Sequence, residues 1–409
     1  MKWSASVTKL NKARSGGRVT YPDLNAPLRT NCSFRQRRHR NHHNKNGVRS
    51  VIEDVIEDMI GDVHLDYMHL VCIGSYKKVL TCYFSHPFDT IRLSAAILEE
   101  ISAFRVYVQK FIPSDFARKP REAKYLNRWK AAELRLDLLY LCPVIYTKFL
   151  SKTRYHHIML LHVAIRLLLE IDSCKEDSVY ADKLLRLFIK ASIKLFGPQF
   201  VSFNIHSLCH LAEGVRKHGS LEETSAFLFE NQIQIIKNSV HQGGKDLEQA
   251  VRRSDEKDAI TLLKLKSRKT NNEKNAVFLV GNHTNGLTLP AVGNAKQYNK
   301  LIFGNSVLSN CLRDSCVIIQ DKILQYFLIE NFVDIAGEPY VIGKRYLTVE
   351  SMFEYPLSST HLFEAVVSCL SELELYPFDV IRYKCIRIPT SFPEIGTFFV
   401  SRLLNLKVN

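Results

Sequence analysis

An acidic and an imidazole side chain interrupt an apolar stretch of this chain. Asp66 and His69 stand three residues apart in GDVHLDYMHLVCIGSYKKVL, residues 61–80. The pattern predicts a strand that gives way to a helix, so the pair would lie at the edge of a core segment. A carboxylate and an imidazole at this spacing form either a buried hydrogen-bonded pair or part of a catalytic site. The spacing alone leaves both interpretations open.

A second acidic residue stands out much later in the chain. Glu230 follows an aromatic-rich turn and opens a new predicted helix. Between the two acids, from 89 to about 270, apolar residues recur every three or four positions, which is typical of helices. Gly197-Pro198 is expected to end one of these helices, because this dipeptide stops a helical pattern. We therefore expect a long helical insertion between Asp66 and Glu230.

The two ends of the chain differ in character from its middle. Residues 1–50 are basic and polar, which predicts an extended arm, and residues 51–60 predict a short amphipathic helix. The charged run 268–275 predicts a linker. From 276 to 409, short β-branched and aromatic runs are separated by Gly, Asn and Pro, which predicts a small antiparallel sheet or barrel.

The net charge favours an anionic partner, of which nucleic acid is the usual one. Lys and Arg outnumber Asp and Glu by 56 to 41, giving +15. A basic protein without such a partner is the alternative, and for the run 252–270 a solvated helix face explains the charges equally well. The arginines expected to contact DNA are Arg35, Arg37, Arg38, Arg40, Arg252 and Arg253.

Cysteine usage and hydropathy bear on the compartment. The ten cysteines are scattered without a CxxC motif, which fits a reducing compartment. The first residues lack the apolar stretch of a signal peptide, and no apolar run approaches the roughly 20 residues of a spanning helix. We expect a nuclear protein, with the cytoplasm as the alternative, and no membrane partner.

Two histidine pairs could bind a metal. His206 and His210 lie four apart on one predicted helix face, and His156 and His157 are adjacent. Without a carboxylate partner, such pairs are expected to serve packing.

Three blocks follow one another in a specific order and spacing. They are LDYMHLVCIGSYKKVL (65–80), NRWKAAELRLDLLYLCPVIYTKFLSKTRYHHIMLLHVAIRLLL (127–169) and NIHSLCHLAEGVRKHGSLEETSAFLFENQIQIIK (204–237). Together with GRVTYPDLNAPLRTNCSFR (17–35), this arrangement resembles transposases of the CACTA (En/Spm-like) group, within the RNase H-like DDE/D class. The resemblance covers roughly residues 17–255.

The resemblance implies roles for individual residues. Asp66 would be the second catalytic acid, His69 its accompanying histidine and Glu230 the third acid, with Mg²⁺ held by Asp66 and Glu230. Strand cleavage and transfer are in-line displacements at phosphate, in which two Mg²⁺ ions about 3.5–4 Å apart activate the attacking oxygen and stabilise the leaving one. Hard cations of this kind prefer carboxylate oxygens. Transposon-end DNA would be the partner, and a homo-oligomer is compatible with the resemblance.

The sequence also departs from the family's pattern. No stretch before Asp66 is predicted as a buried strand ending in the first catalytic Asp, and the turn before Glu230 lacks the family's Pro. We therefore expect an N-terminally truncated, transposon-derived protein that is catalytically incomplete and keeps residual DNA or protein binding. The alternatives are an active strand-transferase once missing upstream sequence is supplied, and a host-adapted scaffold with no DNA role.

The expected fold is α+β, with a partial RNase H-like core, a large all-helical insertion and a small β-rich C-terminal domain. The expected segments are a basic extended arm (1–50), the partial core with its second-Asp strand (51–88), the helical insertion (89–200), a helical segment with the third acid (201–270) and the β-rich domain (276–409).

Overall fold

The computed structural model forms two compact units. The described residues are 19–39, 43, 49–85, 91–240, 244–268, 277–293, 295–304, 306–391 and 396–407. The helical unit comprises the described residues of Met1–Val106, Pro120–Ser225 and Phe353–Ser358. The barrel unit comprises those of Tyr107–Lys119, Ala226–Met352 and Ser359–Asn409. Helices and antiparallel strands are both abundant, which confirms the predicted α+β class.

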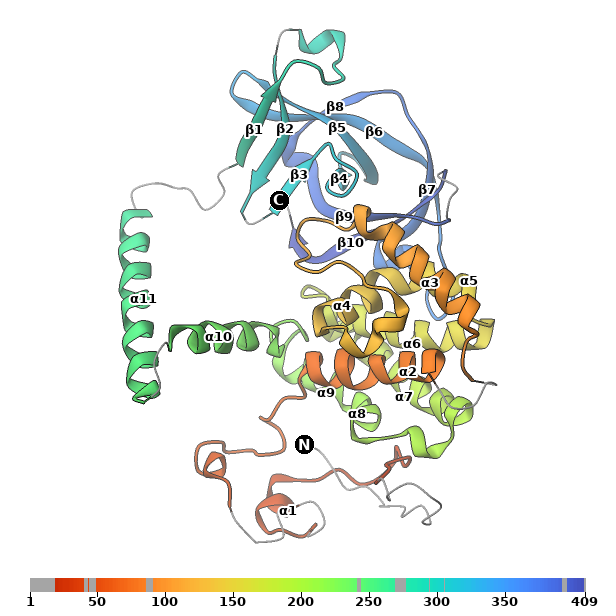
Figure 1. The fold of residues 1–409 in the computed structure, drawn as a ribbon, viewed down its shortest axis with the longest axis vertical. Coiled ribbons are helices and arrows are strands. Elements are labelled where there is room, and N and C mark those ends of the chain that lie inside the picture. Colours follow the sequence, from red (N-terminus) through yellow and green to blue (C-terminus); the bar gives the residue numbers. More distant parts are fainter. Residues whose placement is uncertain are drawn as a thin grey trace. The chain divides into compact units, whose positions relative to one another are not determined.

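The helical unit is built from short and medium helices (Figure 1). In chain order they are α1 (Asn31–Arg35), η2 (Val51–Asp54), η3 (Met68–Tyr76), α2 (Lys77–Ser85), α3 (Ala95–Tyr107), η5 (Ala123–Arg128), α4 (Ala131–Leu136), η6 (Asp137–Leu141), α5 (Cys142–Phe149), α6 (Lys152–Leu169), α7 (Cys174–Phe196), η7 (Pro198–Phe200), α8 (Phe203–Ser207), η8 (Leu208–His210) and α9 (Leu211–His218). Among the described residues of this unit the structure has no strand, and Thr20 forms an isolated bridge.

The strand predicted ahead of Asp66 is wrong. The described residues 49–85 contain only helices and turns, and Asp66 stands just before the π-helix η3. Met68, Leu70, Val71 and Cys72 are all buried, so the segment is apolar on several sides. A short apolar run of this kind is shared by buried strands and buried helices, and its periodicity does not separate them.

The predicted extended arm is partly wrong as well. α1 is a short helix with a capping box, in which Thr30 and Ser33 bond each other's backbone N–H groups. Of the expected amphipathic helix at 51–60, only the 3₁₀ turn η2 forms. The remaining residues of the arm, 1–18, 40–42 and 44–48, lie outside the described residues.

α6 is the central helix of the helical unit. Its side chains are buried on nearly all sides, including Ile158, Leu161, Val163 and Leu168. Every residue from His157 to Leu169 is buried, so this part of α6 belongs to the core. α7 packs against α6 and buries one stripe only. Gly197 ends α7 at φ 84°, a left-handed backbone that glycine adopts without steric cost, as predicted.

A charged pair lies in the interior of this unit. Arg105 forms an ion pair with Asp137, and both side chains are fully buried. The hydroxyls of Tyr76 and Tyr146 donate to Asp137 Oδ2 at 2.6 and 2.9 Å. Burial lowers the pKa of Arg105 to about 10, so the guanidinium stays charged at neutral pH. Both oxygens of Asp137 accept hydrogen bonds, and Arg105 Nε also donates to the Arg121 carbonyl oxygen at 2.6 Å, which offsets the cost of burying the two charges.

The barrel unit contains all the described strands. They are β1 (Val277–His283), β2 (Lys296–Phe303), β3 (Ser306–Ser309), β4 (Cys316–Gln320), β5 (Leu324–Ile335), β6 (Glu338–Glu350), β7 (Glu364–Leu370), β8 (Glu374–Pro377), β9 (Ile381–Pro389) and β10 (Phe398–Lys407). The predicted β-rich region is confirmed. Of the linker predicted at 268–275, only residue 268 is among the described residues.

The strands pair antiparallel into one sheet that closes on itself. The order is β1-β2-β5-β4-β9-β10-β7-β6-β8, and a further pairing of β5 with β6 closes the ring (Figure 1). Gly343 of β6 stands opposite Ile329, and a Cβ there would meet the Leu328 carbonyl oxygen at 2.1 Å. Only glycine fits this crossing, where the register also shifts.

A buried lysine ties the segment Tyr107–Lys119 to the barrel. Lys384 Nζ donates to Asp115 Oδ2 at 2.6 Å, to the Val307 carbonyl at 2.6 Å and to Asp314 Oδ1 at 2.7 Å. Ser114 donates to Asp314 through its backbone N–H and its hydroxyl, at 2.9 and 3.0 Å. Burial opposes ionisation of Asp314, but Lys384 and Ser114 outweigh it and lower its pKa.

The remaining elements of the barrel unit are helical. They are η4 (Val108–Phe111), α10 (Ala226–Ser239), α11 (Asp246–Arg268), η10 (Pro290–Val292), η11 (Ser359–Leu362) and η12 (Phe378–Val380). The helical segment predicted at 201–270 comprises α8, η8, α9, α10 and α11, and Glu230 lies within α10 and not at its start. Among the described residues no helix has both the length and the apolar character needed to cross a membrane.

Candidate functional site

Asp66 and His69 form a hydrogen-bonded pair at the start of η3. Asp66 Oδ2 accepts the backbone N–H of His69 at 2.8 Å and its ring Nδ1–H at 2.5 Å. Asp66 Oδ1 also accepts the backbone N–H of Met68 at 3.2 Å. The side chains are 26% and 57% exposed, so the pair lies at the surface and not in the core.

This geometry answers why the chain places a carboxylate and an imidazole there. An aspartate before a helix satisfies backbone N–H groups that have no helical acceptor, and its charge favours the positive end of the helix dipole. The same carboxylate fixes the ring proton of His69 on Nδ1. Helix capping therefore accounts for an aspartate at position 66 without any bound ligand. The exposed imidazole of His69 is accessible to a phosphate group.

Glu230 lies in a different unit from Asp66. It is exposed on α10, a helix with no buried residue, whereas Asp66 belongs to the helical unit. Each acid is therefore described only within its own unit. Whether Asp66, His69 and Glu230 act together stays a prediction.

The residues around Asp66 do not make a two-ion magnesium site by themselves. Both oxygens of Asp66 already accept hydrogen bonds from the helix start, and Asp66 belongs to no group of three potential metal ligands among the described residues. Two Mg²⁺ ions require several carboxylate oxygens arranged around them. The Mg²⁺ site at Asp66 and Glu230 stays a prediction, and no chemical step is derived from it.

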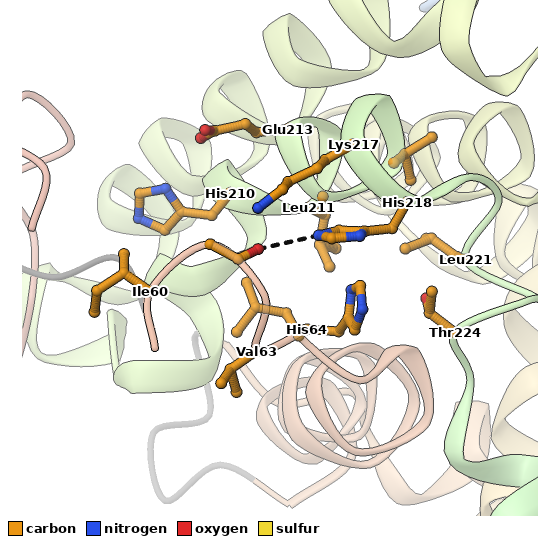
Figure 2. Close-up of a pocket in the computed structure, with 14 residues that line it drawn as sticks. Ile60, Val63, His64, His210, Leu211, Glu213, Lys217, His218, Leu221 and Thr224 are labelled. Carbon is orange, nitrogen blue, oxygen red and sulfur yellow. Dashed lines mark hydrogen bonds between the residues drawn. The ribbon is translucent and has the colours of Figure 1, made fainter. Parts of the chain in front are cut away.

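A pocket with both apolar and polar lining residues adjoins the residues that precede Asp66 (Figure 2). It lies between the turn that precedes η3 and helix α9. Lys217 donates to Asp62 at 2.7 Å, and His218 Nε2 donates to the Gly61 carbonyl at 3.0 Å. The rings of His64 and His218 meet edge to face, with centroids 3.8 Å apart. Burial, then the neighbouring cations, lower the pKa of His64. These contacts hold the turn onto α9.

The predicted DNA-binding arginines mostly bind the protein itself. Arg35 donates to the carbonyls of Glu53 and Ile56, at 3.1 and 2.7 Å, and Arg37 binds both carboxylate oxygens of Glu53. Arg38 donates to Gln36 at 2.7 Å. These contacts fold the described part of the arm onto residues 51–57.

The other predicted arginines differ in setting. Arg252 and Arg253 on α11 both pair with Glu256, at 3.2 and 2.7 Å. Basic and acidic residues alternate along this part of the helix, which gives no strongly positive face. Arg40 lies outside the described residues.

A basic groove between α6 and α7, missed by the sequence reasoning, is a better candidate for binding an anion. We call it the α6–α7 groove. It is lined by Lys152, Thr153, His156, His157, Leu160, Leu187, Ala191, Lys194, Leu195 and Tyr355. Lys190 is exposed on α7 one turn before Lys194. Within the described part of the chain, Lys152, Lys190 and Lys194 form no ion pair.

An aromatic pair lies in this groove. The rings of His156 and Tyr355 are stacked, with centroids 4.4 Å apart and planes at 27°. Tyr180 of α7 donates to the Pro356 carbonyl at 2.7 Å, which holds the segment Phe353–Ser358 against the helices. Burial, then the charge of Lys152, lower the pKa of His156. The seven- and four-residue spacing of Lys183, Lys190 and Lys194 was the available sequence signal, because such residues share one helix face.

The histidines weighed as metal ligands have distinct surroundings. His157 is buried and bonds Ser192 at 2.8 Å, and burial lowers its pKa to about 3, so it serves packing as expected. His206 and His210 are buried together with Cys209, and the three are the one group of potential metal ligands found among the described residues. Burial raises the pKa of Cys209 to about 11.

Comparison with known proteins gives one partial match. Residues 282–401, which belong to the barrel unit apart from the segment Phe353–Ser358 of the helical unit, match a domain of unknown function, DUF8592. No curated protein and no solved structure matches the chain. The comparisons therefore leave the helical unit without a relative of known activity.

Proposed function

We propose that this is a transposon-derived, transposase-like protein that binds DNA through the α6–α7 groove. The observation that carries this proposal is that Lys152 and Lys194 line the groove, with Lys190 exposed one turn before Lys194, and that none of the three has an ion-pair partner among the described residues. Like charges held together on a surface repel one another, and an anion that binds there removes that repulsion. DNA phosphates supply such anions at regular spacing.

Two further features support DNA over a small anion. The stacked His156 and Tyr355 add aromatic surface beside the lysines, a combination used for nucleic-acid strands. The second is the resemblance of residues 17–255 to CACTA transposases, whose substrate is DNA. In this proposal Asp66, His69 and Glu230 are the inherited acid and histidine positions of that family.

The same proposal expects no strand transfer by this chain alone. Two carboxylates offer too few oxygens to hold two Mg²⁺ ions firmly. A cleavage assay on transposon-end DNA with Mg²⁺ should show no turnover above background. Robust cleavage that is lost in Asp66→Ala would contradict this expectation and favour an active enzyme.

DNA binding is tested with a matched pair of triple variants. Lys152→Gln/Lys190→Gln/Lys194→Gln removes three charges at the groove, and Lys245→Gln/Lys300→Gln/Lys322→Gln removes three exposed charges elsewhere. We expect the groove variant to bind a labelled duplex at least about tenfold more weakly at 0.1 M salt, and the control to stay within about twofold to threefold. Equal losses in both variants would show that net charge, and not the groove, accounts for binding.

A second candidate, protein binding, is favoured by α10. Leu228 and Phe229 are 68% and 64% exposed on this helix, and Ile233, Ile235 and Ile236 are also exposed. Exposed apolar side chains in such number are typical of a contact surface. If Leu228→Glu/Phe229→Glu abolished self-association while DNA affinity was unchanged, α10 would be a separate binding surface.

A further inference from the structure

We propose that His206, Cys209 and His210 form a binding site for a transition-metal ion, with Zn²⁺ the ion that best fits this donor set. In the sequence, His206 and His210 stand out only as a pair four residues apart. The structure adds a thiol between them, and this changes the chemistry available at the site.

The geometry brings one donor atom of each residue together. The ligating atoms of the three side chains all lie within 4.8 Å of one another. Positions three and four apart share one face of a helical segment, here the junction of α8, η8 and α9. Tetrahedral Zn²⁺, with bonds of about 2.0–2.3 Å to nitrogen and sulfur, sets its ligands roughly 3.3–3.6 Å apart. Small side-chain rotations cover the difference.

His206 is already oriented as a metal ligand. Its Nδ1 donates to the backbone carbonyl of Tyr21 at 2.7 Å. A carbonyl can only accept, so the proton is on Nδ1 and the lone pair is on Nε2. Metal-ligating histidines commonly have this second hydrogen bond, which fixes the tautomer and the ring orientation.

The three side chains are largely buried, and His210 also lines the pocket of Figure 2. His206 is 4%, Cys209 3% and His210 9% exposed. The backbone of Tyr21 is itself held, because its N–H donates to the Val201 carbonyl at 2.9 Å. A bound ion would therefore join α8, η8 and the segment around Tyr21, and its loss would loosen that segment.

The donor types select the ion. One thiolate and two imidazoles suit Zn²⁺ and related borderline metals, whereas Mg²⁺ requires oxygen donors. Three protein ligands leave one tetrahedral position for water or another donor. The site is chemically distinct from the carboxylate site predicted at Asp66 and Glu230, so the two are tested separately.

The test uses the full chain. Protein purified without chelator is analysed for metal by mass spectrometry, and chelator-treated protein is titrated with Co²⁺. We expect about one Zn²⁺ per chain and a thiolate-to-cobalt charge-transfer band in the near ultraviolet. Cys209→Ser and His206→Gln should bind metal at least about tenfold more weakly. The controls are Cys174→Ser, which replaces another buried cysteine of the helical unit, and His156→Gln. Both controls should bind metal with the affinity of the wild type.

A further variant separates ligation from folding. Cys209→His keeps three donors, so it should retain Zn²⁺ while its Co²⁺ complex loses the charge-transfer band. Absence of metal from the wild type with no Co²⁺ spectrum would overturn the proposal. So would a Cys209→Ser protein that is folded by circular dichroism and binds Co²⁺ with wild-type affinity and spectrum.

Discussion

Lysines in two regions of this protein have opposite surroundings. In the barrel unit, Lys384 is fully buried and donates to three oxygen acceptors at 2.6–2.7 Å. In the α6–α7 groove, Lys152 and Lys194 are exposed and form no ion pair among the described residues.

This difference in burial and bonding separates charged side chains that stabilise the fold from those that are available to a binding partner. A buried charge is stable only when oppositely charged or polar groups replace its water. An exposed charge needs no such replacement, so a group of unpaired lysines costs little stability individually and attracts anions. The arginines first expected to bind DNA resemble Lys384 more than the groove lysines, because Arg35 and Arg37 contact the protein's own acceptors.

The largest effect on stability is expected when the buried Lys384 is replaced. Lys384→Met removes the buried cation between Asp314 and Asp115, whose side chains are 3% and 13% exposed, and leaves Asp314 only its ion pair with the more exposed Arg313 at 3.3 Å. Removing one partner of a buried ion pair costs about 3–5 kcal/mol. Chemical denaturation followed by circular dichroism should show a loss of this size in the free energy of unfolding.

The control and a rescue sharpen that test. Lys322→Met, at an exposed position, should change the free energy of unfolding by less than about 0.5 kcal/mol. Adding Asp314→Asn to Lys384→Met should recover part of the loss, since one unpaired charge is removed. A Lys384→Met protein as stable as the wild type would show that the network contributes nothing.

A medium effect is expected at the helix start. Asp66→Ala removes the cap of η3 and should cost about 1 kcal/mol of unfolding free energy. Asp66→Asn should cost much less, because asparagine caps helices nearly as well. If both variants lost the same stability, the charge pairing with His69 would matter more than the cap.

The smallest effect concerns the groove and pH. Burial, then the charge of Lys152, lower the pKa of His156 below its ordinary 6.5, so its ring is neutral at pH 7 and takes up a proton only at lower pH. Protonation adds a positive charge to the groove, and DNA affinity should therefore rise by about a few-fold as pH falls from 7 towards 5. The rise should be reduced in His156→Gln. An unchanged pH dependence in this variant would exclude His156 as its source.

Long sequence patterns predict the helices and strands of this protein correctly. The length and period of 152–169 and 174–196 indicate helices, and the short β-branched and aromatic runs after 276 indicate strands. The strand expected ahead of Asp66 does not form, because an apolar run without clear periodicity fits a buried helix as well as a strand. The closure of the barrel through β5 and β6 depends on contacts that no local pattern encodes.

The candidate sites were predictable to a smaller extent. The contact of Asp66 with His69 follows from their spacing at a helix start. The α6–α7 groove does not, because it requires Tyr355, almost 200 residues from His156 in sequence, to stack on that ring. The sequence places Cys209 next to His210 and three residues after His206. Only the structure shows that the three side chains are buried with their donor atoms close together, as a metal site requires.

The salt dependence of DNA binding tests the central claim most directly. Each lysine that neutralises a phosphate contributes about 0.9 to the slope of log affinity against log salt concentration for duplex DNA. Lys152→Gln/Lys190→Gln/Lys194→Gln should therefore reduce the slope by about two to three, while the Lys245→Gln/Lys300→Gln/Lys322→Gln control keeps the wild-type slope. The same slope for wild type and groove variant would contradict DNA binding in the α6–α7 groove.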